Sequence, residues 1–71
     1  MTQQIASELV AVVAQVQVVV GQHVEAGEEL VLLESMKMEI PMLAEAAGTV
    51  TQVQVSPGDV VQESDVLVVI D

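Results

Sequence analysis

The amino-acid sequence predicts an all-β fold, and three observations support that prediction. Valine is the commonest residue, and its β-branched side chain is stiff about χ1 and suits a pleated sheet. No segment shows the sustained apolar period of an amphipathic helix. Short apolar runs, some of them alternating with polar residues, are instead separated by segments rich in turn-forming residues.

An internal duplication organises these runs. A shift of 37 residues places the Gln-Val-Gln-Val segment at residues 15–18 on the same four letters at residues 52–55. Two copies are too few for a solenoid, which needs roughly three stacked units. They suit two half-sandwiches that bury one shared core. The same shift aligns Gly21 with Gly58, Val24 with Val61, Leu30 with Leu67 and Glu34 with Asp71.

In the first half, residues 15–18 alternate with period two and predict a strand with Val16 and Val18 facing inward. A glycine turn follows over residues 19–23, and a polar break follows over residues 25–28. The apolar run at residues 30–33 predicts another strand.

The second half repeats this plan. Residues 52–55 predict a strand with Val53 and Val55 facing inward, and the Pro-Gly turn at residues 56–59 ends it. A polar break over residues 62–65 then precedes the apolar run at residues 66–70. Each half therefore reads as about four short strands.

Between the halves, the sequence predicts a β-hairpin with Met36 and Lys37 at its tip and a return strand that continues to Leu43. Pro41 in that return strand indicates an edge or irregular pairing, because proline donates no ladder hydrogen bond. Two-residue hairpin turns favour Asn-Gly and similar pairs, since both positions commonly need positive φ. Met-Lys fits that rule poorly, so we expect either a longer loop or a functional reason for these residues.

Length and composition limit what the chain can do. Residues 1–71 are expected to form a single domain near the lower size limit for independent folding, and 52% of them are hydrophobic. Eleven acids against one base give a formal charge of −10, which disfavours binding to nucleic acid and to anionic membranes. The chain has no targeting segment and no apolar run long enough to span a bilayer, so we expect a soluble, cytoplasmic protein.

We expect no catalytic residue and no metal site. No Ser/His/Asp or Cys/His arrangement and no phosphate-cradling glycine loop is recognisable. His23, the only histidine, lies in a turn and is expected to be solvated or packed. The glutamates at residues 25–29 lack the ligand pattern of a calcium loop and predict a solvated face.

Lys37 is the only basic side chain, and it lies between the two repeated halves. A lysine carries a compact amine on a flexible stem, which can act as a nucleophile once deprotonated and as the base of a movable arm. A modifying enzyme would therefore find a single side-chain amine on this chain. A lone lysine can equally be an ordinary solvated group.

The segment Glu-Ser-Met-Lys-Met-Glu at residues 34–39, in the middle of an all-β duplication with a glycine turn in each half, resembles the biotinyl domain of biotin carboxyl carrier proteins. The resemblance covers essentially the whole chain. It implies a flattened β-barrel or sandwich of two four-stranded antiparallel sheets with quasi-two-fold symmetry. It also implies biotin joined by an amide to Lys37, with Met36 and Met38 as the flanks that biotin protein ligase recognises.

The same resemblance implies a non-catalytic carrier. Biotin on Lys37 would shuttle carboxylate between a biotin carboxylase, which uses ATP and bicarbonate, and a carboxyltransferase. The segment between Val18 and Val24 is too short for the protruding thumb of some family members, and no Ala/Pro-rich tether is present. We therefore expect a thumbless carrier, either stand-alone or excised from a longer chain.

Two alternatives remain open. A lipoyl domain of a 2-oxo acid dehydrogenase has the same fold and a lysine at the same tip, but an acidic residue normally precedes that lysine and alanine often follows it. Met36 and Met38 differ from that pattern. The second alternative is an unmodified structural sandwich, in which Lys37 would be incidental. Ser35, where the biotinyl family more often has alanine, is a small departure from the family pattern.

Overall fold

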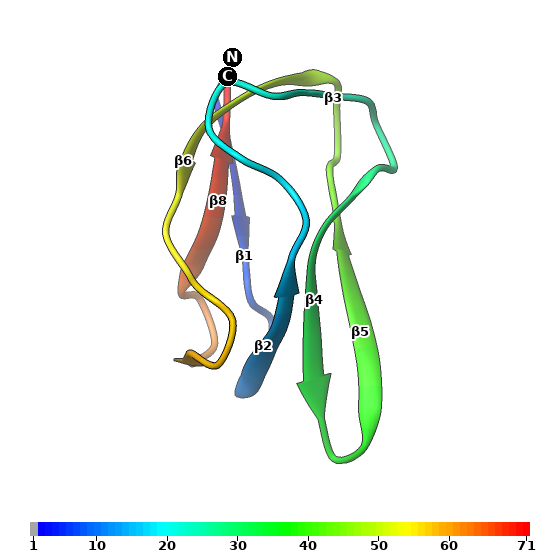
Figure 1. Ribbon diagram of the computed structural model, residues 1–71, viewed down its shortest axis with the longest axis vertical. Coiled ribbons are helices and arrows are strands. Elements are labelled where there is room, and N and C mark those ends of the chain that lie inside the picture. Colours follow the sequence, from blue (N-terminus) through cyan, green and yellow to red (C-terminus); the bar gives the residue numbers. More distant parts are fainter. Residues whose placement is uncertain (1) are drawn as a thin grey trace.

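The computed structural model describes residues 2–71, and these residues form eight strands in two antiparallel four-stranded sheets (Figure 1). The fold class predicted from the sequence is confirmed. The strands are β1 (Gln3–Ala6), β2 (Ala11–Val16), β3 (His23–Val24), β4 (Glu29–Ser35), β5 (Met38–Leu43), β6 (Gly48–Val53), β7 (Val60–Val61) and β8 (Val66–Ile70).

The two sheets are related by the internal duplication. Their strand orders are β1-β8-β6-β3 and β5-β4-β2-β7, and exchanging the two halves of the chain converts one order into the other. The registers agree as well. Val13 pairs with Leu33 where β2 meets β4, and Val50 pairs with Ile70 at the equivalent place where β6 meets β8. The quasi-two-fold symmetry expected from the repeat is therefore present strand by strand.

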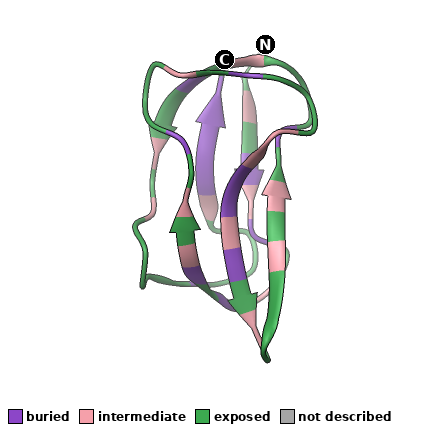
Figure 2. Cartoon of the chain, turned by 45° about the vertical axis from the view of Figure 1, so that its right-hand side comes forward, coloured by how far each residue is buried: buried purple, intermediate pink, exposed green. Residues whose placement is uncertain are grey.

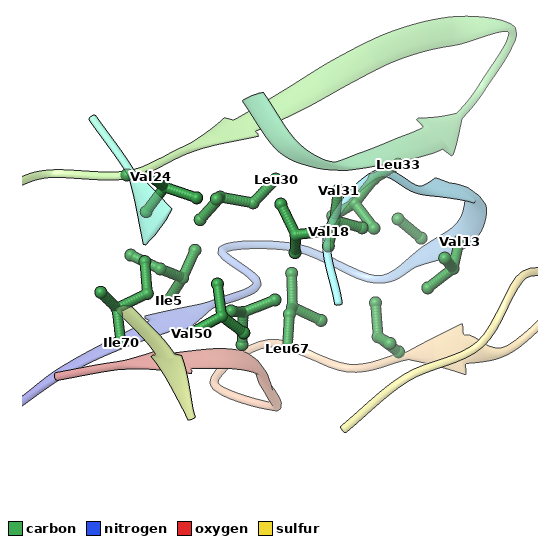
Figure 3. Packing of buried hydrophobic residues seen from close by; sticks show 14 residues of the cluster. Ile5, Val13, Val18, Val24, Leu30, Val31, Leu33, Val50, Leu67 and Ile70 are labelled. Atoms are coloured by element: carbon green, nitrogen blue, oxygen red, sulfur yellow. The ribbon is translucent and has the colours of Figure 1, made fainter. Parts of the chain in front are cut away.

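One hydrophobic core lies between the sheets and takes side chains from both halves (Figure 3). Of the four valines expected to face inward, Val18 is buried, and the other three are half-buried against the core. The largest fully buried side chains are those of Leu30, Leu33, Leu67, Ile70, Val13, Val24, Val31, Val50 and Val68.

The expected bounds of two strands were wrong. Residues 15–18 and 52–55 were expected to be strands, but β2 covers Ala11–Val16 and β6 covers Gly48–Val53. The start of β2 was missed because residues 11–14 are apolar throughout and show no alternation. The alternation is missing because Val12, which lies on the outer face and is 43% exposed, is apolar.

The close approach of β6 to the chain end depends on Gly48. A Cβ at this position would lie 2.7 Å from Cγ2 of Ile70 and 2.9 Å from the carbonyl oxygen of Asp71. The absence of a side chain therefore allows the tight packing of β6 against the end of β8. Its equivalent in the first half is Ala11, which is buried.

The β4–β5 hairpin forms one end of the long axis, and the two chain ends lie side by side at the other end (Figure 1). The Oγ1 of Thr2 donates to Oδ1 of Asp71 at 3.3 Å. β5 is an edge strand, as Pro41 indicated. No helix within residues 2–71 is long and apolar enough to cross a membrane.

Candidate functional site: the tip of the β4–β5 hairpin

The hairpin tip is a two-residue turn. Ser35 pairs with Met38, and only Met36 and Lys37 lie between β4 and β5. Their φ angles are 53° and 66°, which places both residues in the left-handed region. The expectation of a tight turn at these residues is confirmed, and the alternative of a longer loop is wrong.

This turn is conformationally unfavourable for its residues. A residue other than glycine in the left-handed region costs about 1–2 kcal/mol. Local packing offsets little of that cost, because Met36 is 91% exposed and Lys37 is also exposed. The identity of these two residues is therefore not explained by the stability of the hairpin.

Both methionines that flank Lys37 are accessible. Met36 is 91% and Met38 is 61% exposed, so neither methionine fills the core. Figure 2 shows the end of the hairpin coloured as exposed. The alternation of a strand does not extend to the tip, because Met36 and Lys37 have turn dihedrals. A partner that approaches the lysine from the end of the hairpin can thus contact both thioether side chains.

Each strand of the hairpin carries one acidic residue close to the turn. Glu34 on β4 and Glu39 on β5 are direct cross-strand partners. Like charges in this arrangement are destabilising. Within residues 2–71 no carboxylate forms an ion pair with Lys37. The strands next to the turn thus carry two acidic residues, and neither forms an ion pair with the Lys37 amine.

A shallow apolar groove of about 420 Å³ lies next to the tip. Sequence reasoning did not identify it, although the unbroken apolar letters at residues 11–14 were a signal that an outward-facing position is apolar. The Oγ of Ser35, next to the turn, donates to the carbonyl oxygen of Val10 at 3.3 Å and links the end of β4 to this surface. The groove is lined by Val10, Ala11, Val12, Ala14, Glu34, Ser35, Met36 and Val60.

The other residues considered from the sequence lie elsewhere. His23 on β3 is exposed, and its Nε2 lies 2.5 Å from Oε2 of Glu25. Figure 1 places β3 toward the end of the molecule opposite the hairpin tip. Among residues 2–71, no group of three His, Cys, Asp or Glu side chains is arranged to hold a metal ion.

The fold and the lysine at the hairpin tip define a class of protein. Residues 3–70 match the model of the biotin/lipoyl family, which is described as "Biotin-requiring enzyme". The chain belongs to this family. The match includes the complete hairpin and every described strand.

Two relatives sharpen the comparison. The chain is 51% identical over 70 residues to the biotinylated protein TB7.3 homolog of Mycobacterium leprae, which covers 99% of each chain. It is 50% identical over 52 residues to the biotin/lipoyl attachment protein of Bacillus subtilis, covering 73% of this chain and 71% of the relative.

Solved structures agree with the fold. A single-chain, multi-domain long-chain acyl-CoA carboxylase matches 96% of this chain with a TM-score of 0.89 and 35% identity. The urea carboxylase of Kluyveromyces lactis matches 100% of it with a TM-score of 0.92 and 31% identity. This chain spans only 7% and 6% of those two chains. These comparisons support a role as a biotin carrier.

Proposed function

We propose that this protein is a biotin carboxyl carrier and that biotin is joined by an amide to Nζ of Lys37. The observation that carries the proposal is the tip itself. The only side-chain amine of the chain is exposed in a strained two-residue turn between two exposed methionines. Family membership and the biotinylated relative support biotin as the group attached.

The residues of the tip fit such an attachment. The deprotonated Lys37 amine would attack the activated carboxyl carbon of biotin, so that the N–C bond forms as the bond to the activating group breaks and the amine nitrogen releases one proton. The tight pairing of β4 with β5 holds this amine beyond the end of the core. Amide formation removes the only side-chain cation and changes the formal charge from −10 to −11.

The protein then acts by presentation rather than by catalysis. Biotin supplies the chemistry of accepting and releasing carboxylate. The chain positions the biotin and provides the surface that partner enzymes recognise. A covalent tether also keeps the cofactor at a high local concentration at each partner site.

We propose three partners for this carrier. Biotin protein ligase recognises Met36 and Met38 and modifies Lys37. A biotin carboxylase and a carboxyltransferase then use the carrier in turn, which is supported by the structural match to domains of two carboxylases. Because the biotin carboxylase uses ATP and bicarbonate, we place this cycle in the cytoplasm.

The carrier role is tested in cells of the source organism by replacing the chain with Lys37→Arg. Arginine retains the charge but offers no amine for biotin. Extracts are assayed for bicarbonate-dependent carboxylation of acyl-CoA, pyruvate and urea. We expect the variant to lose one of these activities as completely as a deletion does. A variant that retains all the activity lost on deletion would show that Lys37 is incidental and would support the structural alternative.

A further inference from the structure

The groove beside the hairpin is part of a row of side chains that crosses the second sheet. Val12 on β2 pairs with Val60 on β7 and with Glu34 on β4. Direct cross-strand partners share one face of a sheet. The row therefore has an apolar half and an acidic half on the exposed face. Its four members, from β7 to β5, are Val60, Val12, Glu34 and Glu39.

The fold does not require apolar residues at Val12 and Val60, because the equivalent positions in the other sheet are polar. The equivalents of Val12 and Val60 in the other sheet are Thr49 and His23, and these two residues also pair directly. Both are polar and exposed. The same backbone arrangement thus carries polar residues at one end of the molecule and exposed valines at the end that bears Lys37.

Three valines of this surface are exposed to solvent. Val10, Val12 and Val60 are 58%, 43% and 64% exposed. Together with Met36 they contribute to the mostly apolar lining of the groove. Exposed apolar surface of this kind commonly marks a binding site. The formal charge of −10 disfavours a second copy of this chain as its occupant.

We propose that this groove docks the biotinyl group attached to Lys37 of the same molecule. The inference rests on the proposed function. Met36 lines the groove and directly precedes Lys37, so the arm begins at the edge of the groove. The apolar chain and sulfur-containing ring of biotin suit the valines and the thioether of Met36. The ureido N–H groups are donors that suit the Glu34 carboxylate as acceptor.

Covalent attachment makes even a weak contact effective. A short flexible tether gives an effective concentration in the millimolar range, so a contact with a Kd of about 1 mM leaves the arm docked about half of the time. Such an equilibrium shields the ring between encounters and leaves a large extended population for partners. A tenfold weaker contact lowers the docked fraction from about one half to about one tenth.

The test is NMR spectroscopy of the fully biotinylated, isotope-labelled protein. Nuclear Overhauser contacts are expected between the biotin ring protons and the methyl groups of Val10, Val12 and Val60. The variant Val12→Thr with Val60→His copies the polar pair of the other sheet, so the fold itself provides a precedent for it. We expect this variant to be biotinylated normally and to lose the contact with the methyl groups of Val10, which the two substitutions leave in place. The matched control, Thr49→Val with His23→Val, should keep that contact.

The outcomes separate this inference from the function on which it rests. Mass spectrometry is performed first, and a chain that the ligase does not biotinylate would overturn both. Complete biotinylation without ring-to-valine contacts, or a ring-to-Val10 contact that is unchanged in the Val12→Thr and Val60→His variant, would overturn the docking inference alone. Concentration-dependent shifts of the same methyl groups in unmodified protein would assign the groove to a second copy and would also overturn it.

Discussion

Met36 and Met38 allow recognition to be separated from stability at the scale of single residues. Both side chains are mostly exposed, so replacing either with alanine should change the free energy of unfolding by less than about 0.5 kcal/mol. If the ligase contacts them, the same changes should slow biotinylation of Lys37 roughly tenfold, as expected for a truncated contact of central importance. Urea unfolding and a time course of intact mass measure the two effects.

Val19→Ala is the control for the methionine variants. Val19 is 67% exposed and precedes the turn that leads to β3. Its truncation removes a comparable exposed apolar group without touching the hairpin. Equal slowing of biotinylation by Val19→Ala and by the methionine variants would contradict a specific recognition role.

Ser64 has a strained backbone conformation, which a comparison with its equivalent in the first half reveals. It has a φ of 76°, and its equivalent in the first half is Gly27 with a φ of 84°. The backbone bonds match too, because the N–H of Ser64 donates to Ser7 at 2.8 Å and that of Gly27 donates to Ala44 at 2.8 Å. Ser64→Gly should therefore stabilise the protein by about 0.5–1 kcal/mol in urea unfolding. Gly27→Ser should destabilise it, and loss of stability in Ser64→Gly would contradict the strain.

At the scale of an element, the turn of the β4–β5 hairpin should also be strained by residues that have positive φ. Replacing Met36 and Lys37 with Asn-Gly supplies residues that adopt positive φ readily. We expect the variant to be more stable than the wild type by about 1–3 kcal/mol, because two strained residues are relieved. Chemical denaturation measures the gain. Lys37→Arg is the control, since it keeps a side chain at φ 66° and should show no such gain.

A hairpin no more stable with Asn-Gly than with Met-Lys would mean that the wild-type turn is not strained. In that case Met36 and Lys37 would need no functional explanation. The expected gain, together with loss of the attachment site, would instead show that recognition is favoured over stability at the tip.

The hairpin could be predicted from the sequence because its information is local. The strand-forming run at residues 30–33 and the proline at position 41 lie within a few residues of the turn they define. The groove could not be predicted in the same way. Val12 and Val60 are adjacent only because β2 and β7 pair across the duplication, and nothing near either residue in the sequence indicates that pairing. The start of β2 was missed for a different, local reason, since its apolar residues do not alternate with polar ones.

The whole molecule depends on a core that both halves share. Leu30 and Leu67 are equivalent residues, one from each half, and both are fully buried. Truncation of either to alanine should destabilise the entire fold by about 2–5 kcal/mol. Each variant should unfold in one cooperative transition, seen at the same urea concentration by circular dichroism and by methyl NMR signals from both halves. Signals of one half that survive loss of the other would contradict a single domain.

At this scale the fold class and the duplication could be predicted from valine content, alternation and the 37-residue shift. The order of strands within each sheet could not be derived from composition or spacing. It depends on pairings such as β1 with β8, which join the two ends of the chain. The family resemblance implied two four-stranded sheets, and the structure defines their order and register.

The central claim is that Lys37 carries biotin, and intact mass tests it most directly. The protein is co-expressed with biotin protein ligase, supplied with both biotin and lipoate, and fragmented to locate any adduct. We expect a single biotinyl increment on Lys37 and none in Lys37→Arg. A lipoyl increment would place the chain among the dehydrogenase carriers, and the absence of any adduct on Lys37 would contradict the account outright.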